Sequence, residues 1–333
     1  MHNDEAFTDN KVQAQEILDA LDTSLGYRTT AERASLLLRK PNSGEAKNLR
    51  KMDEKRKAQQ EVLASFLDGG VVDTIVELVL KNPNVDPIEY KKYAERVVRG
   101  HTFENLAVRE VYKSLNLSKE DVHVSEVLLD VVRKPKHALS QTLRYFDNHD
   151  VPDEYKSLYA ELVENRPNLT QELDSDPKNN DTLAVRIASD ESTHTRKVEI
   201  TGAYEMKNYD LSKQRKDEQT AFVQTPISAV RQQLLEAQNS MRKTMETLNK
   251  FMPLILYAQG VHALEGQDYE VDIVPKERFR QILFQPADMG YSEPDQKRLG
   301  DVNFEYSSFT TKELQFIYKK ITNEVFARVG IKE

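Results

Sequence analysis

The chain has 333 residues, of which 38% are hydrophobic and 31% are charged, and its formal net charge is −8. It contains no cysteine, which excludes disulfides, thiolate catalysis and zinc sites with cysteine ligands. The negative net charge argues against a protein that holds phosphates over its whole surface, although it leaves room for a local basic patch. Glycine is scarce, at 11 residues, and this favours a mainly α-helical fold.

The first five residues, MHNDE, are acidic and lack the basic and apolar regions of a cleavable signal peptide. No apolar run approaches the roughly 20 residues that a membrane-spanning helix needs. We therefore expect a cytoplasmic protein without a membrane span. Export without a cleavable signal is the alternative for its localisation.

The N-terminal part of the chain predicts a series of helices. Apolar residues at helical spacing predict one helix over 11–25, and Thr29 with Glu32 has the capping-box spacing that starts a second. A third helix is predicted over 45–67. A fourth, over 71–80, is apolar nearly all round and is expected to be buried.

Helix starts then recur along residues 86–165. The Asp-Pro pair at 86–87 begins a helix that Gly100 should end, Thr102 can cap the next, and Ser118 with Asp121 forms another capping box. Starts every 16 to 18 residues, roughly, give helix pairs of roughly 33 to 34 residues, which is typical of helical-hairpin solenoids. Residues 1–165 are therefore predicted to form a helical domain, either a multi-helix bundle or a short α-solenoid.

Residues 166–181 are polar and acidic, and they form the predicted linker. After them the period changes, because Leu183, Val185 and Ile187 alternate with polar residues, and Val198 and Ile200 do so again. This alternation predicts a β-hairpin with one packed face.

The remainder of the chain predicts a small α+β domain over 182–333. A strand is expected near 269–273, followed by a helix that starts at Pro275 and includes Ile282 and Leu283. A loop is predicted over 286–300. Thr310 and Glu313 then form a capping box at the start of the last helix.

A long helix over 226–259 is the element around which this second domain is predicted to be built. Thr225 and Pro226 suit its first positions. Its apolar residues form a stripe along one face of the helix. Such a stripe packs in the core of a helix bundle, and the alternative is a coiled-coil seam for self-association or for a partner helix. Pro253 limits an uninterrupted coiled coil to roughly 227–252. The candidate interface residues of the stripe are Ile227, Val230, Leu234, Met241 and Leu248.

A basic run lies in the helix predicted over 45–67. Asp53 and Glu54 offset part of its charge, so a solvated helix face is the alternative to a binding surface. Aromatic residues for base stacking are absent nearby, which disfavours binding of single strands. The candidate contacts for phosphates or for an acidic partner are Lys47, Arg50, Lys51, Lys55, Arg56 and Lys57.

The sequence lacks the motifs of common enzymes. It has no glycine-rich phosphate loop, no dinucleotide-binding spacing and no nucleophile elbow. The run from Asp147 to Asp150 offers side chains that bind divalent metals, but Asp, Asn and His before Pro152 are also common in turns. We therefore predict a protein without enzymatic activity, cofactor or bound metal.

The stretch from Glu45 to Asn165 resembles the gatekeeper regulators of bacterial type III secretion. The likeness consists of a charged helix, then a helix starting at Asp86-Pro87, then a helix over 101–115. The resemblance implies a cytoplasmic regulator built from helical repeats. The predicted hairpin over 183–201 and the long helix after it depart from that pattern.

The leading hypothesis is a non-catalytic protein that works by binding other proteins, as an adaptor, a regulator or a component of an assembly. Its basis is the set of capped helices and the heptad-like stripe. A homo-oligomer is compatible with the same stripe. The alternative is a protein that binds nucleic acid through the local basic patch of residues 47–57.

Overall fold

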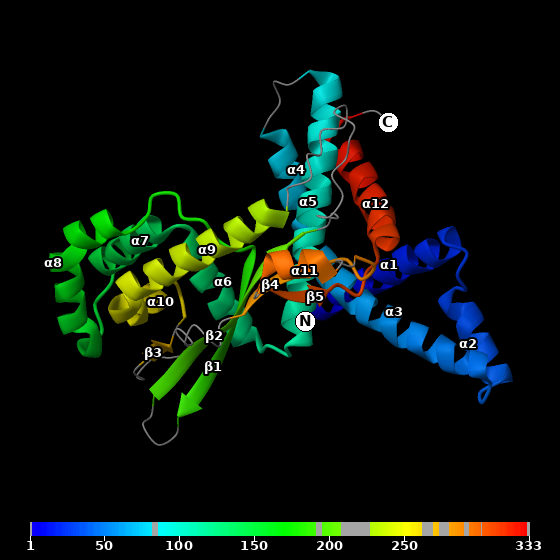
Figure 1. Cartoon of the computed structure of the whole chain (residues 1–333), viewed down its shortest axis with the longest axis horizontal. Helices are drawn as coiled ribbons and strands as arrows, with labels where there is room; N and C mark the ends of the chain where they lie inside the picture. The colour runs from blue at the N-terminus through cyan, green and yellow to red at the C-terminus, as the bar shows by residue number, and fades with distance from the viewer. Residues whose placement is uncertain are drawn as a thin grey trace.

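The computed structural model describes residues 2–81, 86–190, 195–207, 227–261, 269–272, 280–289, 293–300 and 302–331. It is mainly α-helical with an α+β C-terminal part, which confirms the predicted fold class (Figure 1). The helices up to the first strand are α1 (His2–Ser24), α2 (Thr30–Arg39), α3 (Gly44–Asp68), α4 (Val71–Leu80), α5 (Pro87–Ser114), α6 (Lys119–Arg133), α7 (Pro135–Asn148) and α8 (Lys156–Glu172).

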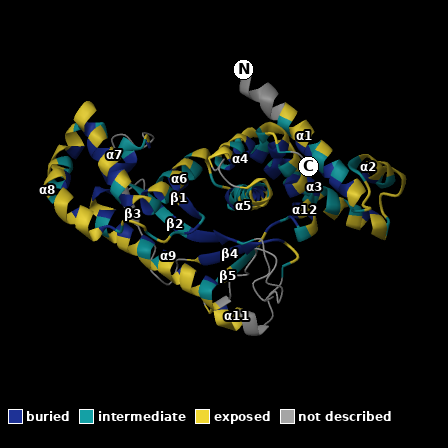
Figure 2. Cartoon of the chain, turned by 90° about the horizontal axis from the view of Figure 1, so that it is seen from above, coloured by how far each residue is buried: buried dark blue, intermediate teal, exposed yellow. Residues whose placement is uncertain are grey.

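The second half of the chain contains a mixed sheet and further helices. Its elements are β1 (Thr182–Asp190), β2 (Thr195–Met206), α9 (Ile227–Leu248), α10 (Met252–Ala258), β3 (Tyr269–Asp272), β4 (Gln281–Gln285), α11 (Glu293–Leu299), β5 (Asn303–Tyr306) and α12 (Thr311–Val329). Short 3-10 turns precede α8 and α10. The molecule is elongated, with α8 at one end and α2 at the other in both views (Figures 1 and 2).

The predicted capping boxes are confirmed. Thr29 caps α2 with Glu32, Ser118 caps α6 with Asp121, and in each the two residues exchange side-chain and backbone hydrogen bonds. A third box starts α12. These signals are reliable because both partners lie within one helical turn, where the backbone itself brings them together.

The predicted break at Gly100 is wrong. Helix α5 runs from Pro87 to Ser114 without interruption, so one long helix replaces two short ones. A glycine inside a helix costs only about 1 kcal/mol. That cost is offset here because Val98 and Phe103, on either side of it, are both buried in the same hydrophobic cluster. The merged helix also removes one of the helix starts behind the predicted 33- to 34-residue repeat and behind the gatekeeper resemblance, which itself stays a prediction.

The segment predicted as a linker begins inside α8. That helix continues past Pro167 to Glu172, although proline removes a backbone hydrogen bond. Leu162 and Leu169 lie two turns apart on either side of the proline and are buried in the same hydrophobic cluster. Their shared burial holds the helix together across it. The predicted domain boundaries themselves stay a prediction.

The predicted β-hairpin is confirmed as β1 and β2, which pair antiparallel with Val185 opposite Ile200. The strand order is β1-β2-β4-β5, and β3 pairs with β2 as well. Strands β3 and β4 both run parallel to β2, and β5 runs parallel to β4.

The helix predicted through Ile282 and Leu283 is wrong, because both residues lie in β4. Every residue of β4 is buried, and a strand buried on both faces shows no alternation that would reveal it. Ile282 packs in the cluster on the α5 side, while Leu283 packs on the opposite face with α9 and α11. The loop predicted over 286–300 contains α11, and β5 was not predicted. Residues 273–279, including the start of that predicted helix, lie outside the described residues.

The long helix predicted over 226–259 is broken near its end. Helix α9 ends at Leu248, a 3-10 turn follows over Asn249–Phe251, and α10 then starts with Pro253 in its first turn. The predicted start at Thr225 and Pro226 lies outside the described residues.

The interior consists of two large hydrophobic clusters (Figure 2). The first joins α1, α3, α4, α5 and α12 to one face of β2 and β4, so the last helix of the chain packs among the first. The second joins α6, α7, α8, α9 and α10 to β1 and β2. Among the helices described, none has the length and apolar character that crossing a membrane requires.

Candidate functional site

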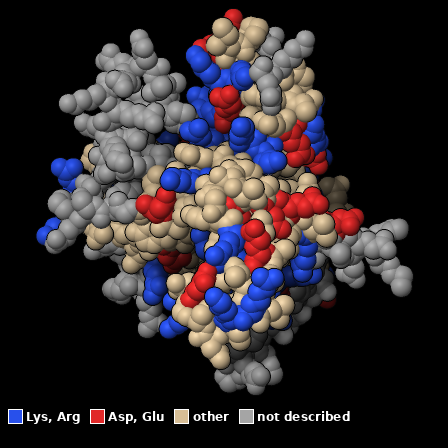
Figure 3. Space-filling view, turned by 90° about the vertical axis from the view of Figure 1, so that its right-hand side faces the viewer, with Lys and Arg blue, Asp and Glu red and all other residues tan. Residues whose placement is uncertain are grey.

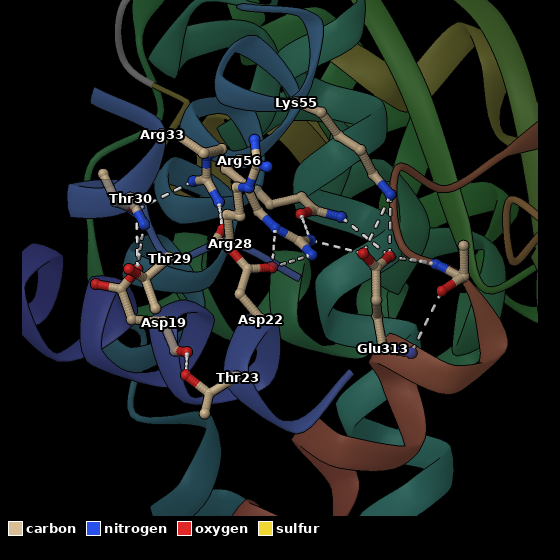
Figure 4. A network of polar contacts seen from close by, with 12 residues as sticks. Asp19, Asp22, Thr23, Arg28, Thr29, Thr30, Arg33, Lys55, Arg56 and Glu313 are labelled. Carbon is tan, nitrogen blue, oxygen red and sulfur yellow. Dashed lines mark hydrogen bonds and ion pairs between the residues drawn. The ribbon is translucent and has the colours of Figure 1, made fainter. Parts of the chain in front are cut away.

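A buried network of charged side chains lies at the base of the α2–α3 hairpin (Figure 4). Asp22 of α1 is fully buried between two arginines. One of its carboxylate oxygens lies 2.6 Å from an Nη of Arg33 in α2. The other accepts hydrogen bonds from Arg56 in α3, at 2.9 Å from Nε and 2.5 Å from Nη2. A single carboxylate therefore joins three helices.

Glu313 extends this network to α12. Its carboxylate lies 2.6 Å from Arg56 and 3.1 Å from Nζ of Lys55, and it also accepts the backbone N–H of Thr310 at 2.8 Å. Burial raises the pKa of Glu313, but the Thr310 amide, Arg56 and Lys55 outweigh it, so the pKa is held below its ordinary value. Glu313 therefore takes part in the capping box of α12 and is also a counter-ion of Arg56 in α3.

The remaining donors of the two buried arginines are also engaged. Arg33 bonds to Asp53 through Nε and donates to the backbone oxygen of Arg28 at 2.5 Å. Arg56 donates to Oε1 of Gln59 at 2.5 Å. Removing one partner from such a group leaves an uncompensated buried charge, which is strongly destabilising. The network therefore fixes the orientation of the hairpin relative to α1 and α12.

The turn between α2 and α3 lies at the end of the molecule remote from α8 (Figures 1 and 2). Leu38, in the last turn of α2, is 85% exposed. Arg50 of α3 donates to the backbone oxygen of Pro41 at 2.6 Å, so the first turns of α3 lie beside this turn. We call this end of the hairpin the hairpin tip, and its exposed charged and apolar residues include Leu38, Arg39, Lys40, Glu45, Lys47, Arg50 and Lys51.

The structure divides the predicted basic run between two faces of α3. Lys47, Arg50, Lys51 and Lys57 are exposed. Arg56, at 4% exposure, is buried, and Lys55 is turned toward Glu313. Arg56 is buried because it lies in helical register with the buried residues Gln59, Leu63 and Phe66.

Asp22 was not predicted to be a functional residue from the sequence, and Glu313 was predicted only as part of a helix capping box. A signal for the network was present, because Asp22 and Arg56 occupy positions in the apolar register of their helices. Charged residues are almost never fully buried unless they are paired. Partners so far apart in sequence, however, cannot be matched by spacing.

The stripe of α9 lies inside the molecule. Val230 and Leu234 pack with Leu283 and Leu299, while Met241 and Leu248 belong to the second large cluster. The helix contacts α11, α6 and α8 of the same chain. The side chain of Ile227 lies outside the described residues. These four side chains are therefore covered by other segments of the same chain, and their predicted role as an interface stays a prediction.

The turn after α7 is organised by local hydrogen bonds. Asn148 donates to the backbone oxygen of Arg144 at 2.7 Å, and the ring of His149 stacks on Tyr145 at 4.2 Å between centroids. Asp147 accepts a hydrogen bond from the Tyr159 hydroxyl at 3.4 Å. Within the ranges described, no group of three or more His, Asp or Glu side chains is placed to hold a metal ion.

The carboxyl of Glu104 in α5 has its pKa raised to about 7. Burial is the main cause, and the charge of Asp181 adds to it, while Arg133 opposes it. His101, one turn earlier, lies 3.8 Å away, and burial lowers the pKa of its imidazole. Both groups are therefore held toward their neutral forms.

Glu104→Gln is expected to stabilise the protein above pH 7 and to have little effect at pH 5. The native carboxyl binds its proton up to about pH 7 and the unfolded one only up to about 4.5, so stability is lost as pH rises through this window. The full pKa shift of Glu104 corresponds to roughly 3 kcal/mol in the free energy of unfolding. Because 33% of the side chain is exposed to solvent, we expect the substitution to add about 1 to 2 kcal/mol of stability above pH 7. Urea unfolding followed by circular dichroism at pH 5 and pH 8 measures this, and an equal effect at both would contradict it.

Comparisons of the chain with protein-family models, with curated proteins and with solved structures found no match.

Proposed function

We propose that this protein is a non-catalytic binding protein whose hairpin tip docks onto the surface of another protein. The observation that carries the proposal is Leu38, a leucine that is 85% exposed at the end of a hairpin with a fixed base. A single exposed leucine is ordinary on a protein surface. What favours binding is its place on a projecting turn whose orientation is held by buried ion pairs.

The cations around Leu38 indicate the chemistry of the partner. Arg39, Lys40, Lys47, Arg50 and Lys51 are exposed beside it. Charged rims around a buried apolar anchor are typical of protein–protein interfaces, in which the anchor supplies affinity and the rim steers association. The tip therefore suits an acidic surface with an apolar pocket at its centre.

Photo-crosslinking tests this proposal. A benzoylphenylalanine placed at position 38 should crosslink to a discrete partner in the cells that make the protein, and one placed at Val163, which is 48% exposed on α8, should not. Binding of the purified partner is then measured by calorimetry. Leu38→Ser should weaken it about tenfold, as expected for an interface anchor.

The control for this measurement is Val163→Ser, the same kind of apolar-to-serine change at an exposed residue of α8, at the opposite end of the molecule (Figure 1). It should leave the affinity unchanged. If Leu38→Ser and Val163→Ser bind as the wild type does, the hairpin tip is not the interface. A partner that crosslinks equally from both positions would also contradict the proposal.

Nucleic-acid binding is a second candidate, favoured by the exposed cations Lys47, Arg50, Lys51 and Lys57 on α3. Figure 3 shows, however, that Lys and Arg at this end of the molecule are interspersed with Asp and Glu. Fluorescence anisotropy with a labelled duplex distinguishes the two functions. Binding through phosphates would fall steeply between 50 and 200 mM salt and would be lost in a Lys47→Glu, Arg50→Glu variant, whereas Leu38→Ser would leave it unchanged.

A further inference from the structure

The first strand of the sheet is an outer strand, and helix α6 lies along its outer side. Among the strands that the structure describes, β1 pairs only with β2. In an antiparallel pair, every second residue of an outer strand points its backbone N–H and C=O away from the neighbouring strand. A row of such groups is a template for pairing with another chain, and native proteins therefore cover it.

Two side chains of α6 bind the outward amides of β1. The backbone N–H of Val185 donates to the hydroxyl of Ser125 at 3.1 Å, and that of Ile187 donates to one carboxylate oxygen of Asp121 at 2.9 Å. Four residues of helix and two residues of strand both advance by about 6 to 7 Å. The spacing of the two acceptors along α6 therefore matches the spacing of two successive outward amides.

The carboxylate of Asp121 is divided between α6 and β1. Its other oxygen accepts the backbone N–H of Ser118 at 2.9 Å and the Ser118 hydroxyl at 2.8 Å, which closes the capping box of α6. A capping box needs an acceptor only toward its N-cap residue. The hydrogen bond from Ile187 is therefore not required for the start of the helix.

Further contacts hold the start of α6 against both strands of the hairpin. Glu120 forms an ion pair with Arg196 of β2 at 2.7 Å. Just before α6, the backbone oxygen of Leu115 accepts a hydrogen bond from Arg186 of β1 at 2.8 Å. The first turns of α6 are thus positioned by side chains as well as by the two amides of β1.

We propose that α6 is a guard that prevents β1 from pairing with the β1 strand of a second copy of the chain. Without Asp121 and Ser125, two outward amides of β1 lose their partners, which favours any new acceptor. A second copy carries the same row of groups. Two such edges can pair antiparallel about a two-fold axis, so that each supplies the acceptors that the other needs. The inference goes beyond the function proposed for the hairpin tip, and it depends on different residues.

Hydrogen exchange and light scattering on the full-length protein test the proposal. The double variant Asp121→Ala, Ser125→Ala removes both acceptors. The amides of Val185 and Ile187 should then exchange about tenfold faster when the protein is dilute. At higher concentration the variant should show a larger mass than the wild type. Ser125→Ala alone is the milder variant, and it should speed the exchange of Val185 more than that of Ile187 even if the double variant does not fold.

A spin label identifies the surface through which the double variant associates. The chain contains no cysteine, so Ala188→Cys, at an exposed position of β1, gives a single labelled site. Neighbouring strands lie about 4.8 Å apart, so two labels on paired β1 strands should broaden each other's electron paramagnetic resonance spectrum. A label at Glu164→Cys, exposed on α8, should not be broadened.

Ser118→Ala is the matched control, because it opens the capping box of α6 but leaves both acceptors at the edge of β1. It should keep the wild-type mass and the slow exchange of Val185 and Ile187. A double variant with the wild-type mass, equal self-association of Ser118→Ala, or equal broadening at positions 164 and 188 would each overturn the proposal. Unchanged exchange of Val185 in Ser125→Ala would also overturn it.

Discussion

Replacing Asp22 by asparagine is expected to lower the free energy of unfolding by about 3 to 5 kcal/mol. Its carboxylate is the shared counter-ion of Arg33 and Arg56, and all three side chains are buried. Asparagine keeps the size of the side chain but leaves two guanidinium groups without a negative partner between them. Urea unfolding followed by circular dichroism at pH 7 measures the loss.

Asp174→Asn is the control for this change. Asp174 pairs with Lys243 at 2.9 Å, but 40% of its side chain is exposed, so water replaces the lost partner. We expect a change within about 1 kcal/mol. If Asp22→Asn costs no more than this exposed pair does, the buried network does not hold the base of the hairpin.

Met241→Ala is expected to cost about 2 to 5 kcal/mol of stability and to leave the mass in solution unchanged. Met241 is buried in the second hydrophobic cluster, where α9 packs on α6 and α8 of its own chain. Truncation removes buried apolar surface and opens a cavity in one molecule. Light scattering gives the mass, and thermal and urea unfolding give the stability.

Leu235→Ala lies on the outward side of the same helix, where Leu235 is 44% exposed, and it controls for helix propensity. It should change the stability by no more than about 0.5 kcal/mol. The opposite pattern for Met241→Ala, a lower mass with the stability preserved, would show that the stripe of α9 is an interface between copies. The coiled-coil interpretation of that stripe would then be correct.

The network and the stripe illustrate a common limit of reasoning from spacing. In α9 the periodicity identified a buried face correctly, but it could not say whether the same chain or a partner covers that face. In α3 the density of cations suggested a binding surface. The tertiary structure turned Arg56 inward because Asp22 and Glu313, from helices far away in the sequence, meet there.

The amino-acid sequence by itself determined the features whose partners lie within a few residues of one another. These are the capping boxes at Thr29, Ser118 and Thr310, the alternation of the β1–β2 hairpin, and the mainly helical composition. They can be predicted because the local backbone fixes the distance between the interacting groups.

Only the tertiary structure decided the continuity of α5 through Gly100, the identity of β4 as a strand, the buried ion pairs and the contact of α6 with the edge of β1. Each depends on groups that are remote in sequence and become neighbours after folding. Leu283, for example, is buried between β2 and β5 and under α9, so the burial that makes it part of a strand is supplied by other segments. The free energy of that burial outweighs the local secondary-structure propensity of the segment, and the spacing of residues along the chain cannot predict it.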